Sequence, residues 1–259
     1  MTAVTAAADR PRLDMGRVVK TTFGSIKRNI VVFGLFSAVL VAAPDSAIAW
    51  LGYVMKAAGA SSDETSGVAL LGRIVDLIAS AVLTGALAYG VVEDLAGRRP
   101  AAIATFRAGL RNSAKVFGIK FLVGLVSVLA AILLIVPGVI LALRWSMAAP
   151  AGVIEGVGVN EAINRSAILT RGNRWAILGL TVALFLLVLL FVFLVNFVII
   201  VLQTLVAPGE FGGIATAVTS GVASGLLGMF LAAGSAVTYA ELRSMSEGVL
   251  PDQLASVFD

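Results

Sequence analysis

The basic residues of this chain gather in clusters that long, nearly charge-free runs separate. All but Lys56 and Arg73 of the 19 Lys and Arg residues lie within Arg10–Arg28, Arg98–Lys120 or Arg165–Arg174, at Arg144 just upstream, or at Arg243. Apolar residues make up 59% of the chain and charged residues 13%, against about 45–50% and about 25% in soluble domains. This pattern is typical of a multi-pass membrane protein, in which basic residues mark the cytoplasmic loops.

A helix needs about 20 residues to cross the ~30 Å hydrocarbon layer, and six segments suit that purpose. They are 30–54, 67–92, 116–136, 138–154, 175–206 and 211–239. Only Pro137-Gly138 separates the third from the fourth, and we interpret it as a tight turn because two crossings keep both flanking basic clusters on one side. The sequence therefore predicts an all-α bundle of six transmembrane helices, one membrane domain over 12–247 with both termini in the cytoplasm. A disordered tail at 1–11 and a C-terminal tail at 248–259 complete the chain.

Each odd-numbered crossing follows a basic stretch, so we interpret the chain as three hairpins, each preceded by a basic interfacial helix. The cations of these stretches are expected to contact the headgroups of anionic lipid. They are Arg17, Lys20, Lys27 and Arg28 in the first stretch, Arg107, Arg111 and Lys115 in the second, and Arg171 and Arg174 at the end of the third. The alternative is that any loop before a crossing is basic, without a threefold repeat.

Three groups of residues carry a resemblance to a known family. The first is Ala96-Gly97-Arg98-Arg99-Pro100 with Phe106 to Asn112, and the second is Val136-Pro137-Gly138 with Arg144-Trp145, Pro150 and Glu155. The third runs from Asn160-Glu161-Ala162 through Arg165-Ser166 to Thr170-Arg171-Gly172-Asn173-Arg174-Trp175. Together they resemble the membrane-domain family of bacterial glycerophosphodiester phosphodiesterases and of related stand-alone six-helix inner-membrane proteins.

This resemblance covers about residues 15–247, with its densest part at 96–180. It implies a six-helix domain in a bacterial inner membrane. It does not imply phosphodiesterase activity, because in that family the activity belongs to a separate soluble barrel rich in Glu, Asp and His. We expect no such barrel in this chain, and no catalytic residue can be transferred to it.

Four charged residues are assigned to the expected crossings: Asp45, Arg73, Asp76 and Arg144. An ionised side chain at the bilayer centre costs at least about 2.5–3.5 kcal/mol, so each is expected to find a partner. Arg73 and Asp76 share a helix face, and Asp45, which follows a proline kink, has Arg144 as its natural partner. With Asn196 they form a predicted polar cluster in the outer half of the membrane. This cluster either ties the helices together or lines a binding or ion pathway open to the outside.

The sixth span repeats small residues every four positions, among them Ser220, Ser224, Gly228 and Ala232. A ridge of small residues lets two helix backbones approach closely in lipid. We predict that this ridge packs against other helices of the same chain. A seam between two copies of the chain is the alternative.

Histidine and cysteine are absent, so the usual general base and the thiolate metal ligands are missing. We predict no metal, no cofactor and no catalytic residue, and we expect Glu155 to pair with a nearby Arg. The favoured function is that of a non-catalytic, multi-pass inner-membrane protein that binds or organises anionic lipid or a membrane protein partner.

A small transporter or channel built on the polar cluster is the second function class. The third is an enzyme acting on lipid headgroups, but the spacing of Glu93, Asp94, Glu155 and Glu161 matches no carboxylate template. A second copy of the chain, forming a homo-oligomer, is the alternative to a different membrane protein as partner. We expect no nucleic-acid partner, because the charges flank apolar runs and do not form one face.

Overall fold

The computed structural model of the chain describes residues 13–206, 211–248 and 253. Of these residues 89% are helical and none lies in a strand. Six helical segments are long and apolar enough to cross a membrane, which confirms the expected all-α chain with six candidate spans. They are Ile30–Ala57, Ser62–Leu95, Ala102–Leu133, Ile135–Ile154, Arg174–Val201 and Gly212–Glu247. The tail expected at 1–11 and nearly all of the one at 248–259 lie outside the described residues.

The helices follow one another with short connections. In chain order they are α1 (Met15–Arg28), α2 (Ile30–Ser37), the π-helical turn η2 (Ala38–Ala42), α3 (Ala43–Ala57), α4 (Ser62–Leu95), α5 (Ala102–Leu133), α6 (Ile135–Trp145), α7 (Ala148–Ile154), α8 (Val159–Leu169), α9 (Arg174–Val206) and α10 (Phe211–Glu247). The first span comprises α2, η2 and α3 without a break. Its π turn ends two residues before Pro44, whose ring interrupts a regular hydrogen-bond ladder.

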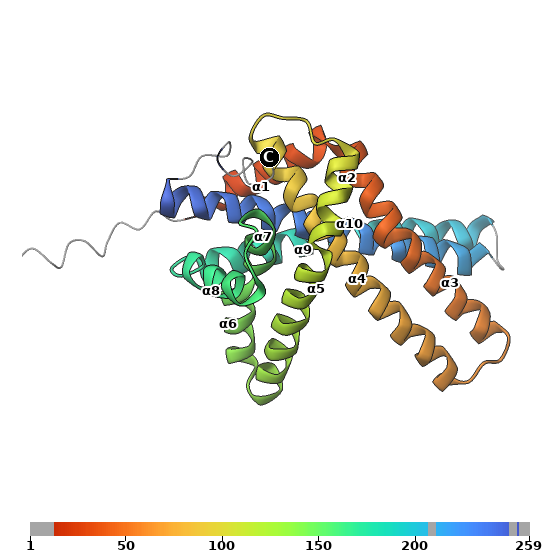
Figure 1. Cartoon of the computed structure of the whole chain (residues 1–259). Coiled ribbons are helices and arrows are strands. Elements are labelled where there is room, and N and C mark those ends of the chain that lie inside the picture. Colours follow the sequence, from red (N-terminus) through yellow and green to blue (C-terminus); the bar gives the residue numbers. More distant parts are fainter. Residues whose placement is uncertain (1–12, 207–210, 249–252, 254–259) are drawn as a thin grey trace, which may run out of the picture.

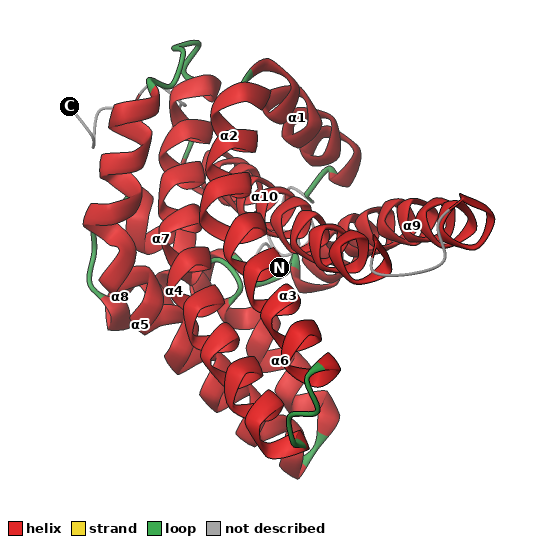
Figure 2. Cartoon of the chain, turned by 90° about the vertical axis from the view of Figure 1, so that its right-hand side faces the viewer, coloured by secondary structure: helices red, strands yellow, loops and turns green. Residues whose placement is uncertain are grey.

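Consecutive spans lie side by side in three pairs, α3 with α4, α5 with α6, and α9 with α10. Figure 1 shows these pairs pointing in different directions from a common end, and Figure 2 shows α9 extending away from α4 and α5. Helix α10 packs on α3 and α4 as well as on α9. The short helices α1, α7 and α8 pack around the common end, which we call the base. The opposite ends of the pairs, which include the 58–61 loop and the turn at Leu134, are the tips.

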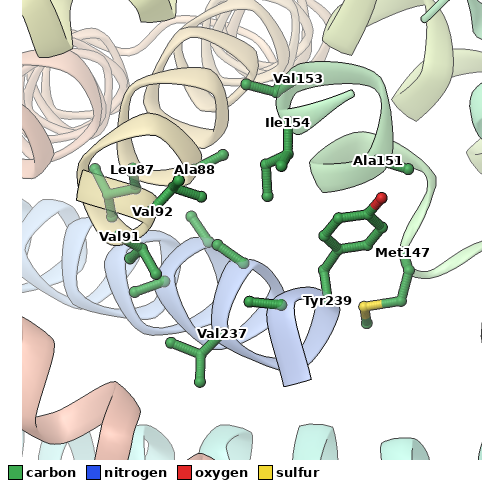
Figure 3. Packing of buried hydrophobic residues seen from close by; sticks show 14 of the residues in the cluster. Leu87, Ala88, Val91, Val92, Met147, Ala151, Val153, Ile154, Val237 and Tyr239 are labelled. Atoms are coloured by element: carbon green, nitrogen blue, oxygen red, sulfur yellow. The ribbon is translucent and has the colours of Figure 1, made fainter. Parts of the chain in front are cut away.

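The hydrophobic core lies at the base. Leu87 and Val91 of α4, Ile154 of α7 and Tyr239 of α10 are fully buried there (Figure 3). Toward the tips the apolar side chains are exposed, as Leu133 is at 81%. Lipid tails are as apolar as these side chains, so the outer parts of the spans need no protein cover in a bilayer.

The third and fourth spans meet at a residue other than the predicted one. Leu134 adopts an extended conformation between the end of α5 and the start of α6. Pro137 falls in the first turn of α6, where its missing N–H leaves no hydrogen bond unmade. A Cβ on Gly138 would lie 2.6 Å from the Cβ of Ala131 on α5. The prediction of a turn at Pro137-Gly138 is therefore wrong, because this pair serves the start and packing of α6.

The fourth span is not the continuous helix expected over 138–154, because α6 ends at Trp145 and α7 begins at Ala148, with two residues between them. The buried Ser166 hydroxyl of α8 stabilises this break. It donates a hydrogen bond to the carbonyl of Arg144 at 2.9 Å and accepts one from the backbone N–H of Met147 at 3.1 Å. Helix ends leave backbone groups unpaired, and this one side chain pairs a group on each side of the break.

The three basic stretches do not form three equivalent helices. The first and third are the separate helices α1 and α8, but α5 runs without interruption from Ala102 to Leu133. A separate interfacial helix in the second unit is therefore a wrong prediction. The start of α5 packs tightly on α4, because a Cβ on Gly109 would lie 2.7 Å from the carbonyl oxygen of Val82. This contact holds the basic stretch in line with its span.

Candidate functional site

A cavity of about 560 Å³ lies among the three pairs of spans and extends from the base to the middle of α4. Residues of α4, α5, α7, α9 and α10 line it. Its α9 and α10 side is mostly apolar, with Leu180 and Leu231 among the lining residues. Its α4 and α5 side carries the charged residues Arg73, Asp76 and Lys120. The cavity is thus apolar on one side and charged on the other.

The charged side chains are arranged by the contact between α4 and α5. The Nζ of Lys120 donates a hydrogen bond to the carbonyl of Ser80 on α4 at 2.9 Å. The Asp76 carboxylate interacts electrostatically with Asp45, Lys120 and Arg73. In the part of the chain that the structure describes, no side chain forms a hydrogen bond or an ion pair within 4.0 Å with Asp76 or Arg73. Placing a charged side chain in an apolar setting costs free energy, and no direct contact with an opposite charge offsets that cost for Asp76 or Arg73 among the described residues.

The structure brings together three members of the predicted polar cluster, Asp45, Arg73 and Asp76, and leaves out two. Arg144 is exposed at the end of α6 and makes no ion pair with Asp45 among the described residues. The reason is that α3 packs on α4 and α10, whereas α6 packs on α5, α8 and α9. Asn196 donates a hydrogen bond to the carbonyl of Val192 in its own helix. The expected pair of Asp45 and Arg144 is therefore wrong.

Lys120 is the member that the sequence-based cluster lacks. By position it belongs to the basic cluster that ends there, but it also falls inside the span expected at 116–136. That overlap was the signal that could have identified it as an intramembrane charge. The structure places it against α4, so the cluster contains two cations and two carboxylates.

The small residues of α10 serve two purposes. Ser224, Gly228 and Ala232 line the cavity, and Ser220 is exposed. Close packing against the first span involves other positions, because the Ser37 hydroxyl donates a hydrogen bond of 2.5 Å to the carbonyl of Gly225. The predicted packing ridge is therefore wrong for Ser220. In the half of α10 nearer the tip, the residues that contact the first span are Gly221 and Gly225, each one position after the predicted residue.

A second polar group lies in the base, around Glu155. Arg165 of α8 donates hydrogen bonds to both carboxylate oxygens of Glu155 at 2.8 and 3.0 Å, which confirms the expected pairing with an Arg. The Tyr239 hydroxyl also donates to Glu155, and Arg243 lies 3.6 Å from it. Glu247 pairs with both Arg165 and Arg243. The network joins the end of α7 to α8 and α10.

The Glu155 network favours the charged form of Arg165. Burial disfavours the charge of Arg165, but hydrogen bonds to Glu155 and Glu247 outweigh it and raise the pKa of the guanidinium above its ordinary value. The Tyr239 contact lies 84 positions away in sequence from Glu155, so no local pattern could have predicted it. The Glu155 network therefore holds α7, α8 and α10 together.

The cations expected to contact lipid fall into two groups. Some are held by the protein: Arg17 pairs with Glu241 at 3.0 Å, Arg28 with Asp94, and Lys115 donates to the carbonyl of Gly152 at 3.1 Å. The Arg28 hydrogen bond to Asp94 raises the pKa of Arg28 above its ordinary value. Arg174 is half-buried, with an Nε that has no hydrogen-bond partner.

The remaining expected lipid contacts are Lys20, Lys27, Arg107, Arg111 and Arg171, and Arg99 resembles them. All six are exposed, and none forms an ion pair with a described residue. Beside Arg99 is a cavity of about 520 Å³ that Arg28, Arg98 and Val32 also line. The base therefore presents free positive charge next to the ends of apolar helices.

The described residues hold no group of three or more Asp or Glu side chains that could bind a metal ion. A family model, described as Domain of unknown function (DUF7847), matches residues 95–242. No curated protein and no solved structure matches the chain.

Proposed function

The chain belongs to this family of unknown function, and we propose that it is a non-catalytic, multi-pass membrane protein that binds anionic lipid at its base. One observation carries the proposal, namely the exposed cations that have no carboxylate partner and lie beside the ends of apolar spans. They are Lys20, Lys27, Arg99, Arg107, Arg111 and Arg171. Each Lys or Arg near an anionic membrane surface contributes about 1 kcal/mol. Together such residues favour anionic over zwitterionic lipid.

Internal ion pairs support the proposal because they fix the helices that carry the free cations. Arg17 and Arg28 tie the two ends of α1 to α10 and α4. Lys20 and Lys27 of the same helix stay exposed. The protein thus uses some cations to hold α1 in place and leaves others to face the headgroups.

A variant that combines Lys20→Gln, Lys27→Gln, Arg107→Gln and Arg111→Gln tests this function. In reconstituted vesicles, spin-labelled phosphatidylglycerol should be held at the protein surface more than spin-labelled phosphatidylcholine. The preference should weaken between about 0.05 and 0.5 M salt, because salt screens exposed charges. The variant should lose most of the preference, which electron spin resonance measures.

Lys56→Gln is the control, since it removes an exposed lysine from a tip. It should leave the lipid preference unchanged. A preference for anionic lipid that survives in the fourfold variant, or that ignores salt, would contradict the proposed function.

We further propose that the three pairs of spans are membrane hairpins in a bacterial inner membrane, with the base and both termini in the cytoplasm. The basic residues support this orientation, because positively charged loops stay on the cytoplasmic side. The tip between α3 and α4 carries Asp63 and Glu64, whereas the base carries most of the cations.

Single cysteines test this threading cleanly, because the chain has no Cys of its own. With Arg171→Cys, a membrane-impermeant thiol reagent should label only inverted vesicles, in which the cytoplasmic face is outward. With Asp63→Cys, the same reagent should label intact cells. Both residues are exposed, so burial does not block the reaction. Labelling of position 171 from outside intact cells would refute the orientation.

The resemblance to the membrane domains of glycerophosphodiester phosphodiesterases enters here as a proposal of common descent. Two observations support it. The family match at 95–242 contains the densest part of the resemblance, and residues that carry the resemblance contact one another, as Glu155 does with Arg165 and Ser166 with the carbonyl of Arg144. A solved structure of such a domain should show both contacts at the matching positions.

A further inference from the structure

The cavity among the spans has a row of alternating charges on one wall. Arg73, Asp76 and Ser80 are spaced three and four residues apart, so they share one face of α4. Lys120 meets this face at the Ser80 carbonyl. At 1.5 Å per residue, Asp76 lies about 6 Å and Arg73 about 10 Å from Ser80 along the helix. The order along the wall is therefore cation, anion, cation.

These charges are free to bind a ligand. Lys120 uses one of its three N–H donors for Ser80, and no other hydrogen bond to its ammonium group is present among the described residues. The side chains of Asp76 and Arg73 form no hydrogen bond and no ion pair within 4.0 Å in that part of the chain, although the charges of Asp45, Lys120 and Arg73 act on Asp76 from a longer distance. A ligand with a negative group beside a positive one would complement Lys120 and Asp76 together.

The part of the lining that α9 and α10 contribute suits an acyl chain. Leu180 and Leu184 of α9 and Leu227 of α10 belong to it. Ser224 and Gly228 of α10 leave room that larger side chains would fill. The volume of about 560 Å³ falls within the range of about 300–1,000 Å³ that ligand sites occupy. The cavity can therefore hold part of an amphiphile.

Lys120 connects the charged residues of the cavity to the part of α5 that reaches the base. Lys115 contacts the carbonyl of Gly152 in the base, and Lys120 follows it by five residues, or about 8 Å along α5. Arg111, an exposed cation of the base, precedes Lys120 by nine residues, or about 14 Å along α5, so a headgroup from the lipid leaflet at the base has to move inward by about that distance to meet Lys120.

We propose that the cavity binds one phospholipid whose headgroup carries a phosphate and a protonated primary amine, as in phosphatidylethanolamine. The phosphate lies against Lys120, the ammonium group donates to Asp76, and an acyl chain lies along the α9–α10 wall. The site is independent of the anionic-lipid surface proposed for the base, because it uses other residues and a zwitterionic headgroup.

Lipid retention by the purified full-length protein tests the site. The protein is reconstituted with phosphatidylethanolamine, phosphatidylcholine and phosphatidylglycerol of identical acyl chains, stripped with detergent, and the retained lipid is quantified by mass spectrometry. Wild type should retain phosphatidylethanolamine at least about tenfold over phosphatidylcholine, whose trimethylated nitrogen cannot donate a hydrogen bond. Lys120→Met should lose retention, and Asp76→Asn should lose the preference between these two lipids.

Lys56→Met and Asp63→Asn are the matched controls, because they make the same changes at exposed positions. Both should retain lipid as wild type does. Equal retention of phosphatidylethanolamine and phosphatidylcholine by wild type would overturn the proposal, as would full retention of phosphatidylethanolamine by Lys120→Met. Phosphatidylglycerol retained in excess reports on the base and not on the cavity. The wild-type comparison decides the matter even where a variant fails to fold.

Discussion

Replacing Glu155 with Gln should lower the free energy of unfolding by about 3 kcal/mol, near the lower end of the range for breaking a buried ion pair. The Glu155 side chain is only 12% exposed and faces two guanidinium groups. Without its charge, Glu247 alone is left to pair with Arg165 and Arg243. The Tyr239 hydroxyl would donate to a neutral acceptor in place of a charged one, which weakens that bond as well. Unfolding of the purified protein in mixed micelles, followed by circular dichroism, measures the loss.

Glu161→Gln provides the control, since Glu161 is exposed on α8 and takes part in no ion pair with a described residue. Its effect should stay within about 0.5 kcal/mol. The double variant Glu155→Gln with Arg165→Gln should cost less than the sum of the two single changes, because each single change already breaks their shared pair. Strict additivity would show that the two side chains do not stabilise each other.

The spans were predictable because hydropathy is a local property of the chain. All six apolar segments are mainly helical, although the fourth is divided into α6 and α7, and the first is irregular near the proline where a kink was expected. Positions that depend on contacts between helices were not predictable in the same way. The turn at Leu134 is an example, because the sequence offers Pro137-Gly138 as a stronger turn signal. The structure instead needs Gly138 for its contact with Ala131.

The charged residues illustrate the same limit. Arg73 and Asp76 share a face of one helix, so their proximity follows from spacing alone. Whether Arg144 meets Asp45 depends on which helix α6 packs against, and no local pattern contains that information. Glu155 and Arg165 are ten residues apart and could be guessed, but the contact with Tyr239 requires α10 to return to the base.

The contact between α10 and the first span should be the packing site most sensitive to added volume. A Cβ on Gly221 would overlap the Ser46 hydroxyl and the carbonyl of Ala42. The carbonyl belongs to the backbone of the π turn and cannot rotate away as a side chain can. We therefore expect Gly221→Ala to cost about 3 kcal/mol, at the upper end for overpacked sites, even though alanine favours helices by about 1 kcal/mol.

A graded series separates this contact from helix propensity. A Cβ on Gly225 would lie 3.0 Å from the Cβ of Ala42 and from the Ser37 hydroxyl, so Gly225→Ala should cost less than Gly221→Ala. Gly124 on α5 has open space around it, and Gly124→Ala should be neutral or slightly stabilising. Unfolding midpoints in the order Gly221→Ala lowest, then Gly225→Ala, then Gly124→Ala would follow from the packing. If all three variants unfolded alike, α10 would not pack on the first span as closely as the structure shows, and the small residues of α10 would be free to meet another chain.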